Sequence, residues 1–401
     1  MTYFFELGSN IALSVAEIAA VFGMKENYRL IGGKILLFED ALSFAEEKAI
    51  GKMGGVIKIG ELFERKIKNI NIKECLPFLE ELILGKTEKI CFGVSYYGRK
   101  KINIKHLGMD IKSLIKERDG NCRWVSGKEN VLSSVIVEQN RLLTKGFELI
   151  IIETENGFYL GHTKAVQPFK ELSARDYGRP ARDDHSGMLP PKLAQIMINL
   201  VSADFGNKLE KKIYDPFCGS GTILTEAMLM GFANVFGSDL SERAVLDTKK
   251  NIGWIVRRFG DTKDIFKKEP EVRQLDVRRL GAFLEKKSID MIATEPYLGP
   301  QRGLTDIYAV KKELECLYKE ALGQFKQILK AKGRVVIIFP IFKQKQKMQF
   351  LNVDLTGFKL INPLPISLQN EKALNLSFRK TIIYGRESQR VWREIVVLEM
   401  N

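Results

Sequence analysis

The chain has 401 residues, 45% of them hydrophobic, which is enough for two or three domains with their own cores. Its net charge of +14 favours a polyanionic partner, and the excess lies in residues 61–170 and 171–401. Five scattered cysteines without a Cys-x-x-Cys pair, and three distant histidines, argue against disulfides and a metal site. The amino terminus does not look like a signal peptide and no long apolar run is present, so we expect a soluble, cytoplasmic protein without a membrane span.

Residues 1–58 alternate short strands and helices. We expect strands at 3–7 and 34–38 and helices at 13–22 and 42–53. This order favours a small α+β domain of the ferredoxin-like type, whose role on sequence grounds is packing.

Residues 59–165 form a more basic segment. Helices are expected at 72–84 and 104–118, with strands at 89–97, 123–125, 148–153 and 157–162. The basic side chains that we expect to contact a nucleic acid are Lys105, Lys112, Lys116, Arg123 and Lys145. The alternative is a solvated helix face. The element order, with Gly93, Tyr97, Lys112, Arg123, Leu132-Ser133-Ser134, Asn140 and Thr163, resembles a THUMP domain, which implies RNA binding.

Residues 166–195 read as a linker, and prolines at 180, 190 and 191 stiffen it. Pro191 suits the first turn of a helix that runs to residue 201. A mere tether would be rich in Gly and Ser, so we expect this segment to position the domains on either side of it.

Residues 212–227 hold the central motif of the chain, a short apolar strand that ends at Asp215, turns through Gly219 and Gly221 and enters a helix. A phosphate-binding loop would need Lys and Ser or Thr after its second glycine, and a dinucleotide loop would need a third glycine at Leu224. S-adenosyl-L-methionine (AdoMet) is the remaining ligand. The alternative is a buried glycine turn without a ligand. The run Asp-Pro-Phe-Cys-Gly-Ser-Gly-Thr resembles the first motif of methyltransferases that modify exocyclic amines, which implies cofactor contacts at Asp215, Pro216, Phe217, Cys218, Gly219, Gly221 and Thr222.

After this motif, strands and helices alternate through the rest of residues 196–401. Strands are expected at 234–239, 271–276, 289–294 and 333–339, helices at 242–259 and 308–329, and a closing hairpin at 379–384 and 393–398. Such alternation predicts a mainly parallel α/β sheet with helices on both faces, as in a Rossmann-like methyltransferase domain.

Acidic residues recur where successive strands end, at Asp215, Asp239, Asp276 and Glu295. AdoMet presents hydroxyl, amine and cationic groups that such carboxylates can bind. We expect Asp239 to bind the ribose, Asp276 the adenine amine and Asp215 the methionine amino group. A single strand-end Asp is more often a helix cap, but four in register favour a ligand. The further expected cofactor contacts are Leu240, Val277 and Pro190; the segment with Pro190 resembles one that borders AdoMet in amine-directed tRNA methyltransferases.

The expected catalytic residues are Glu295, Pro296 and Tyr297, where amine methyltransferases carry Asp/Asn-Pro-Pro-aromatic. Glu295 and the Pro296 carbonyl would accept hydrogen bonds from the target amine, and Tyr297 would stack on the flipped base. Glu replaces the shorter acidic residue, and one proline is missing. A proline turn after a buried strand is the structural alternative.

Taken in order, these segments resemble the archaeal and eukaryotic tRNA guanosine N2-methyltransferases that act at position 10. The resemblance implies AdoMet-dependent methylation of a guanosine N2 amine, with tRNA as partner and, as in eukaryotic relatives, a small activating subunit. Two alternatives stay open: a DNA amine methyltransferase and a catalytically silent THUMP RNA-binding protein.

Overall fold

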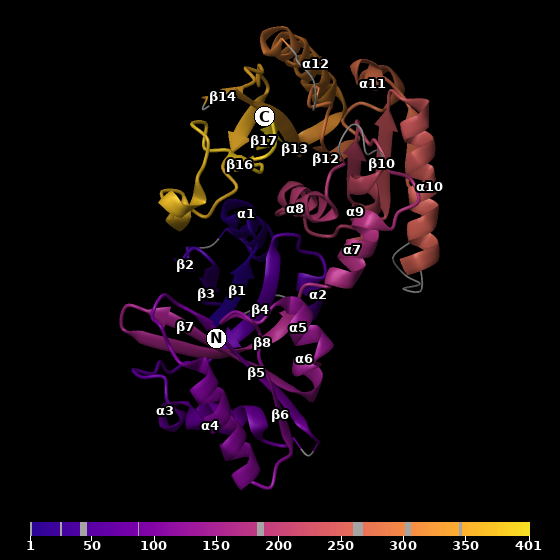
Figure 1. The fold of residues 1–401 in the computed structure, drawn as a ribbon. Coiled ribbons are helices and arrows are strands. Elements are labelled where there is room, and N and C mark those ends of the chain that lie inside the picture. The colour runs from indigo at the N-terminus through magenta and orange to yellow at the C-terminus, as the bar shows by residue number, and fades with distance from the viewer. Residues whose placement is uncertain are drawn as a thin grey trace. The chain divides into compact units, whose positions relative to one another are not determined.

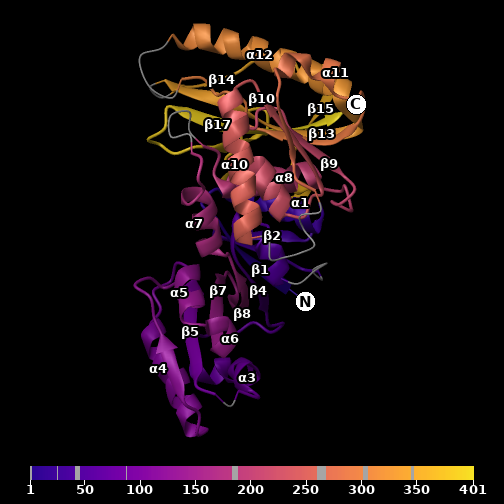
Figure 2. The same cartoon turned by 90° about the vertical axis from the view of Figure 1, so that its right-hand side faces the viewer.

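The computed structural model describes residues 2–24, 26–40, 46–86, 88–182, 188–259, 268–300, 306–344 and 347–401. These residues form two compact units, each built on a β-sheet (Figures 1 and 2). The first unit comprises residues 1–11, 25–170 and 365–373, and the second comprises residues 12–24, 171–364 and 374–401.

The sheet of the first unit has the strand order β2-β3-β1-β4-β8-β7-β5-β6. Its strands are β1 (Thr2–Leu7), β2 (Tyr28–Ile31), β3 (Ile35–Phe38), β4 (Val56–Leu62), β5 (Ile90–Tyr97), β6 (Cys122–Val125), β7 (Gly146–Thr154) and β8 (Gly157–Val166). Helices α1 (Ile11–Phe22) and α2 (Glu46–Ile50) lie between the first four strands in the sequence. The resulting βαββαβ order is that of a ferredoxin-like motif.

Two strands of this motif, β2 and β4, were not predicted. β2 and β3 form a hairpin whose turn contains Gly32 and Gly33, both with positive φ, and this glycine pair is the signal that could have revealed it. β4 was not predicted because Lys58 interrupts its apolar pattern. The expected boundary at residue 58 falls within β4, and strands on both sides of it share one sheet. Part of the helix expected at 42–53 lies outside the described residues.

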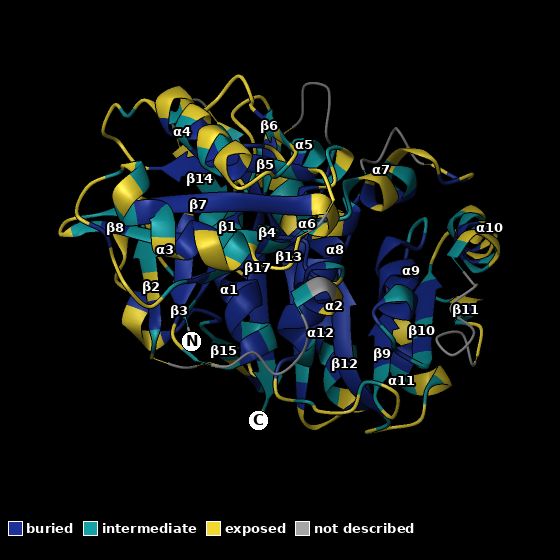
Figure 3. Ribbon diagram, turned by 90° about the horizontal axis from the view of Figure 1, so that it is seen from below, coloured by how far each residue is buried: buried dark blue, intermediate teal, exposed yellow. Residues whose placement is uncertain are grey.

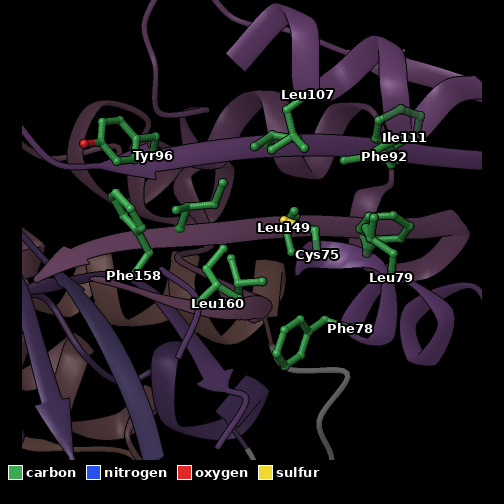
Figure 4. Packing of buried hydrophobic residues seen from close by; sticks show 14 of the residues in the cluster. Cys75, Phe78, Leu79, Phe92, Tyr96, Leu107, Ile111, Leu149, Phe158 and Leu160 are labelled. Carbon is green, nitrogen blue, oxygen red and sulfur yellow. The ribbon is translucent and has the colours of Figure 1, made fainter. Parts of the chain in front are cut away.

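Nearly all of α1 belongs to the second unit. Besides α2, the first unit contains the helices α3 (Ile72–Ile83), α4 (Ile104–Glu117), α5 (Ser134–Gln139) and α6 (Leu142–Lys145). Leu107, Ile111 and Ile115 recur every four residues along α4 and are buried, which makes this helix amphipathic. Figure 4 shows Leu107 and Ile111 packed with Phe92 of β5 and Leu149 of β7. The basic side chains of α4 are therefore left on its outer face.

The sheet of the second unit has the order β11-β10-β9-β12-β13-β17-β15, with β14 on β13 and β16 on β17. The strands are β9 (Lys212–Asp215), β10 (Asn234–Asp239), β11 (Glu271–Gln274), β12 (Ile289–Thr294), β13 (Leu329–Gln344), β14 (Lys347–Phe350), β15 (Phe358–Ile361), β16 (Ile382–Tyr384) and β17 (Val391–Met400). β9 to β13 are parallel, and β17 runs antiparallel to β13. The expected parallel sheet with an antiparallel closing hairpin is confirmed, whereas β14 and β15 were not predicted.

The helices of the second unit are α8 (Pro191–Ser202), α9 (Thr222–Leu229), α10 (Glu242–Phe259), α11 (Leu280–Phe283) and α12 (Ile307–Ile328), together with the short 3-10 helix η1 (Val277–Arg279). The expected linker contains a helix that was not predicted, α7 (Phe169–Tyr177). Figure 3 shows β9 and β12 as buried and α10 with an exposed outer face. The chain order reverses between β9 and β12, and ligands of open α/β sheets bind at such a point.

Candidate cofactor and catalytic site

The glycine loop follows β9 and leads into α9. Gly219 and Gly221 have φ values of +52° and +84°, a region that side chains with a Cβ rarely occupy. A Cβ on Gly221 would lie 2.8 Å from Thr248, but one on Gly219 would meet nothing within 4 Å. Gly221 therefore permits close packing, whereas Gly219 borders open space into which a ligand can fit.

Asp239, at the end of β10, fixes the backbone of this loop. One carboxylate oxygen accepts a hydrogen bond from the Gly219 N–H at 2.9 Å, and the other accepts one from Ser241 N–H at 3.0 Å. The Thr248 hydroxyl donates to the Gly219 carbonyl at 2.7 Å. Leu275 N–H donates to the Asp239 carbonyl, which ties the end of β11 to the end of β10. The strand ends are thus held side by side around Gly219.

Asp215, at the end of β9, is buried, with 2% of its surface exposed. It accepts hydrogen bonds from the Thr294 hydroxyl at 2.7 Å and from Phe217 N–H at 3.1 Å. Burial, with the negative charges of Asp239 and Glu295, raises its pKa to about 7. Among the described residues no ion pair involves it, so the amino group of AdoMet would supply the cation that this carboxylate lacks. The residues present therefore fit the cofactor.

The raised pKa of Asp215 predicts that AdoMet binding depends on pH. The folded pKa of this carboxyl group lies above the unfolded value of about 3.9, so its favourable contribution to folding is present below pH 4 and lost as the pH rises through 7. A bound ammonium group favours the ionised form, so AdoMet affinity should fall by up to about tenfold per unit as the pH drops from 7 to 5.5. Calorimetry across this range measures the effect, and Asp215→Asn should abolish it and melt higher than wild type at pH 8. A flat profile in the wild type would contradict the assignment.

The other predicted cofactor residues lie around the same loop and the neighbouring strand ends. Pro216 and Cys218 are buried, Phe217 is half-buried, Thr222 begins α9, Val277 is buried in η1 and Pro190 precedes α8. Leu240 is 64% exposed and borders a groove of about 690 Å³ together with Leu275 and Asp276. An exposed apolar residue at the rim of a groove suits contact with an adenine ring.

Asp276 has a partner that the sequence did not indicate. Its carboxylate pairs with the Arg278 guanidinium at 2.6 Å and accepts from Arg278 N–H at 3.0 Å. These hydrogen bonds lower the pKa of Asp276. Asp276 is therefore ionised and caps η1, and its contact with adenine remains a prediction.

Glu295 follows β12 and is held by Arg393 of β17. Arg393 Nε donates to Glu295 Oε1 at 2.5 Å, and both side chains are almost buried. Burial lowers the pKa of Arg393, but the charge of Glu295 and its hydrogen bond outweigh this and raise it. Sequence reasoning missed Arg393 because 98 residues separate the pair and only the strand register brings them together.

Pro296 and Tyr297 continue the motif. Pro296 is buried, and the Tyr297 ring is 54% exposed, as a ring that stacks on a base must be. The Tyr318 hydroxyl donates to the Tyr297 carbonyl at 3.1 Å, and Gly299 has a φ of +84°. The turn after β12 is thus anchored from α12 while its aromatic ring remains accessible.

The segment before α8 binds the glycine loop directly. Arg175 Nε donates to Glu226 of α9 at 2.7 Å in a buried ion pair, and Arg179 donates to the Thr222 hydroxyl. Asn251 joins the Ala181 and Ser220 carbonyls through its amide nitrogen. These residues were predicted to position domains; the structure shows that they brace α9 and the glycine loop. Residues 183–187, which include His185, lie outside the described residues.

The predicted RNA-contacting residues belong to the first unit. Lys105, Lys112 and Lys116 lie along α4 and Arg123 lies on β6, where its guanidinium bonds to the Asn140 side chain. Lys145 ends α6 and forms a 3.4 Å ion pair with Glu88. Their contact with RNA remains a prediction.

The described ranges contain no helix long and apolar enough to cross a membrane. They also contain no cluster of three or more His, Cys, Asp or Glu side chains arranged to hold a metal ion.

Comparison with known proteins adds to this geometry. Residues 179–353 match the family described as UPF0020, RMKL-like, methyltransferase domain. The tRNA (guanine(10)-N2)-dimethyltransferase of Pyrococcus abyssi is 27% identical over 338 residues, which covers 79% of this chain and 89% of the relative. The enzyme of the same name from Methanothermobacter thermautotrophicus is 30% identical over 239 residues, 60% of this chain and 59% of the relative.

A solved structure shares the fold. The crystal structure of TrmN from Thermus thermophilus matches over 100% of both chains, with a TM-score of 0.52 and 17% identity. The Rossmann-like methyltransferase fold that the sequence predicted is confirmed. The chain is therefore an AdoMet-dependent methyltransferase, and it is similar to archaeal enzymes that carry the name tRNA (guanine(10)-N2)-dimethyltransferase.

Proposed function

We propose that this protein transfers a methyl group from AdoMet to the exocyclic N2 amine of a tRNA guanosine, at position 10. The observation that carries the proposal is the likeness to the Pyrococcus abyssi enzyme over 79% of the chain. The carboxylates at the ends of β9, β10 and β12 support it, because these strands are neighbours in the sheet and Asp239 binds the N–H of Gly219, which borders open space.

AdoMet supplies an activated methyl group on a positively charged sulfur. An exocyclic guanine amine is a weak nucleophile because its lone pair is delocalised into the ring, so the enzyme must hold its nitrogen in position. Glu295 and the Pro296 carbonyl accept the N–H hydrogen bonds that provide this orientation. Tyr297 stacks against the base, and the Glu295 carboxylate accepts the proton that the amine loses.

Arg393 offers an account of the longer acidic residue in this motif. A glutamate has one more rotatable bond than aspartate and loses more side-chain entropy when it is fixed. The charge-assisted hydrogen bond from Arg393 holds it in one rotamer before substrate binds. The Glu295–Arg393 pair thus provides the preorganisation that a shorter carboxylate has by itself.

The proposal assigns RNA binding to residues 59–165 as a THUMP-like module. The conversion of Lys112 or Arg123 to alanine should weaken tRNA binding several-fold and reduce the slope of log affinity against log salt by about one. The measurement is a filter-binding titration at several salt concentrations. Lys34→Ala, which removes an exposed lysine between β2 and β3, is the matched control. An unchanged slope in the Lys112 and Arg123 variants would exclude both residues from the interface.

The activity test uses a tRNA transcript with guanosine at position 10, the same transcript with adenosine there, duplex DNA and labelled AdoMet. Label in N2-methylguanosine from the first RNA alone supports the proposal. Preferential labelling of DNA would favour the DNA amine methyltransferase. AdoMet binding without any methyl transfer would favour the silent RNA-binding alternative.

A small activating subunit and a cytoplasmic location are further parts of the proposal. Full activity of the purified chain alone would contradict the need for a subunit.

A further inference from the structure

A short braced turn, Ser377–Thr381, leads into β16 and lies within the second unit. Ser377 N–H donates to the Thr381 carbonyl and Lys380 N–H to the Ser377 carbonyl, both at 2.9 Å. Lys380 has a φ of +60°, a conformation that costs a residue with a side chain about 1 kcal/mol. Backbone strain of this kind persists only where surrounding contacts impose it.

Those contacts converge on Glu394 of β17, which is fully buried. Arg379 donates to both of its oxygens, at 2.6 and 3.2 Å, and the Thr381 hydroxyl donates to one of them. Arg379 also donates to the Leu351 carbonyl at 3.1 Å. The turn is therefore rigid and does not depend on its exposed residues for stability.

The braced turn presents an aromatic ring to solvent. Phe378 is 76% exposed and makes a T-shaped contact with Phe350 of β14 at a centroid distance of 5.1 Å. The Arg379 guanidinium lies 5.1 Å from the centre of the Phe378 ring. Lys380, two residues further along the turn, is exposed, and exposed basic residues also occur on the hairpins of β14 and β16, at Lys347, Arg386 and Arg390. A fixed, exposed ring next to basic side chains is typical of surfaces that bind unpaired nucleotides.

We propose that Phe378 stacks on an unpaired base of the RNA substrate while Lys380 contacts the adjoining phosphate. The chemistry favours RNA over a protein partner, because one exposed ring among cations is too small an apolar patch for a stable protein interface. This inference rests on the proposed function for the identity of the RNA.

The position of the turn indicates which nucleotide is bound. Glu394 follows Arg393, the residue that holds Glu295, and successive side chains of a strand point to opposite faces of the sheet. The turn and the catalytic carboxylate therefore lie on opposite faces of β17, close to its beginning. The beginning of β17 lies at the edge of the sheet where the parallel strands end, so Phe378 is separated from Glu295 by β17 and binds a nucleotide other than the target guanosine.

The experiment measures tRNA affinity and kcat/KM for wild type, Phe378→Ala, Phe378→Trp and Lys380→Asn. Phe378→Ala should weaken tRNA binding about tenfold with an unchanged salt slope, and Phe378→Trp should retain wild-type affinity because it keeps a ring. Lys380→Asn removes the charge but tolerates the positive φ, and should reduce the salt slope by about one. Leu246→Ala, at an exposed apolar position of α10, is the matched control.

The outcomes separate this inference from the proposed function. If wild type methylates tRNA but Phe378→Ala matches it in affinity and kcat/KM, the stacking inference is wrong and the function stands. If wild type methylates no tRNA but Phe378→Ala still weakens binding to it, the inference stands and the function falls. Equal AdoMet affinity in all variants shows that the fold of the second unit is intact.

Discussion

Replacement of Glu295 by alanine is expected to lower kcat by about 10²- to 10³-fold while AdoMet affinity stays within about threefold of wild type. The reason is that Glu295 acts on the target amine at the end of β12, whereas the proposed cofactor contacts lie at the ends of β9 and β10. Single-turnover methylation with saturating tRNA measures the chemical step, and calorimetry measures AdoMet binding.

The Glu295→Ala substitution also affects stability, because Glu295 pairs with Arg393. Glu295→Ala leaves the Arg393 guanidinium nearly buried without its carboxylate, which can cost about 3–5 kcal/mol of stability. The double variant Glu295→Ala/Arg393→Met removes both charges and should recover much of that stability but none of the activity. Recovery of activity in the double variant would show that Glu295 is only structural.

Arg393→Met alone tests the positioning role. It should lower kcat with little change in the KM for tRNA, because Glu295 remains present but is no longer held in one rotamer. Arg393→Lys should restore part of the rate, since it returns the charge without the guanidinium geometry. Equal loss in the Lys and Met variants would argue against a role for the charge.

Asp239→Ala is expected to weaken AdoMet binding by at least about 100-fold. The substitution removes the predicted ribose acceptor and also the oxygen that holds the Gly219 N–H, so both the ligand contact and the shape of the loop are lost. Calorimetry with AdoMet gives the affinity, and thermal melting shows whether the fold survives.

Two variants control this experiment. Asp239→Asn keeps an oxygen for Gly219 but loses the charge and one acceptor, so its affinity should lie between those of wild type and Asp239→Ala. Asp247→Asn changes a partly exposed aspartate of α10 that pairs with Arg243 at 3.9 Å, and it should bind AdoMet like wild type. Wild-type affinity in Asp239→Ala would remove β10 from the cofactor site.

The elements of the second unit could be predicted from the sequence because their signals are local. The apolar run of β12 and the amphipathic pattern of α10 have the predicted bounds, 289–294 and 242–259. Gly219 and Gly221 predicted the turn between β9 and α9. Because parallel strands end at the same edge of a sheet, the sequence alone predicted that the carboxylates Asp215, Asp239 and Glu295 lie close together.

The contacts that make those residues work were not predictable in this way. Arg393 meets Glu295 only through the register of β17 on β13, and Arg179 meets Thr222 only because the segment before α8 folds back on α9. The braced turn forms around Glu394 from residues that look like an ordinary loop in the sequence. β4 was missed because its buried Lys58 is stabilised by Glu148, 90 residues away.

The amino-acid sequence by itself thus determined the order of elements, the glycine loop and the acidic strand ends, since periodicity and turn chemistry act over a few neighbouring residues. The tertiary structure alone decided which charges are paired and which carboxylate stays uncompensated. Ion pairs and burial depend on strand register and on segments far apart in the chain, and no short stretch of sequence specifies either.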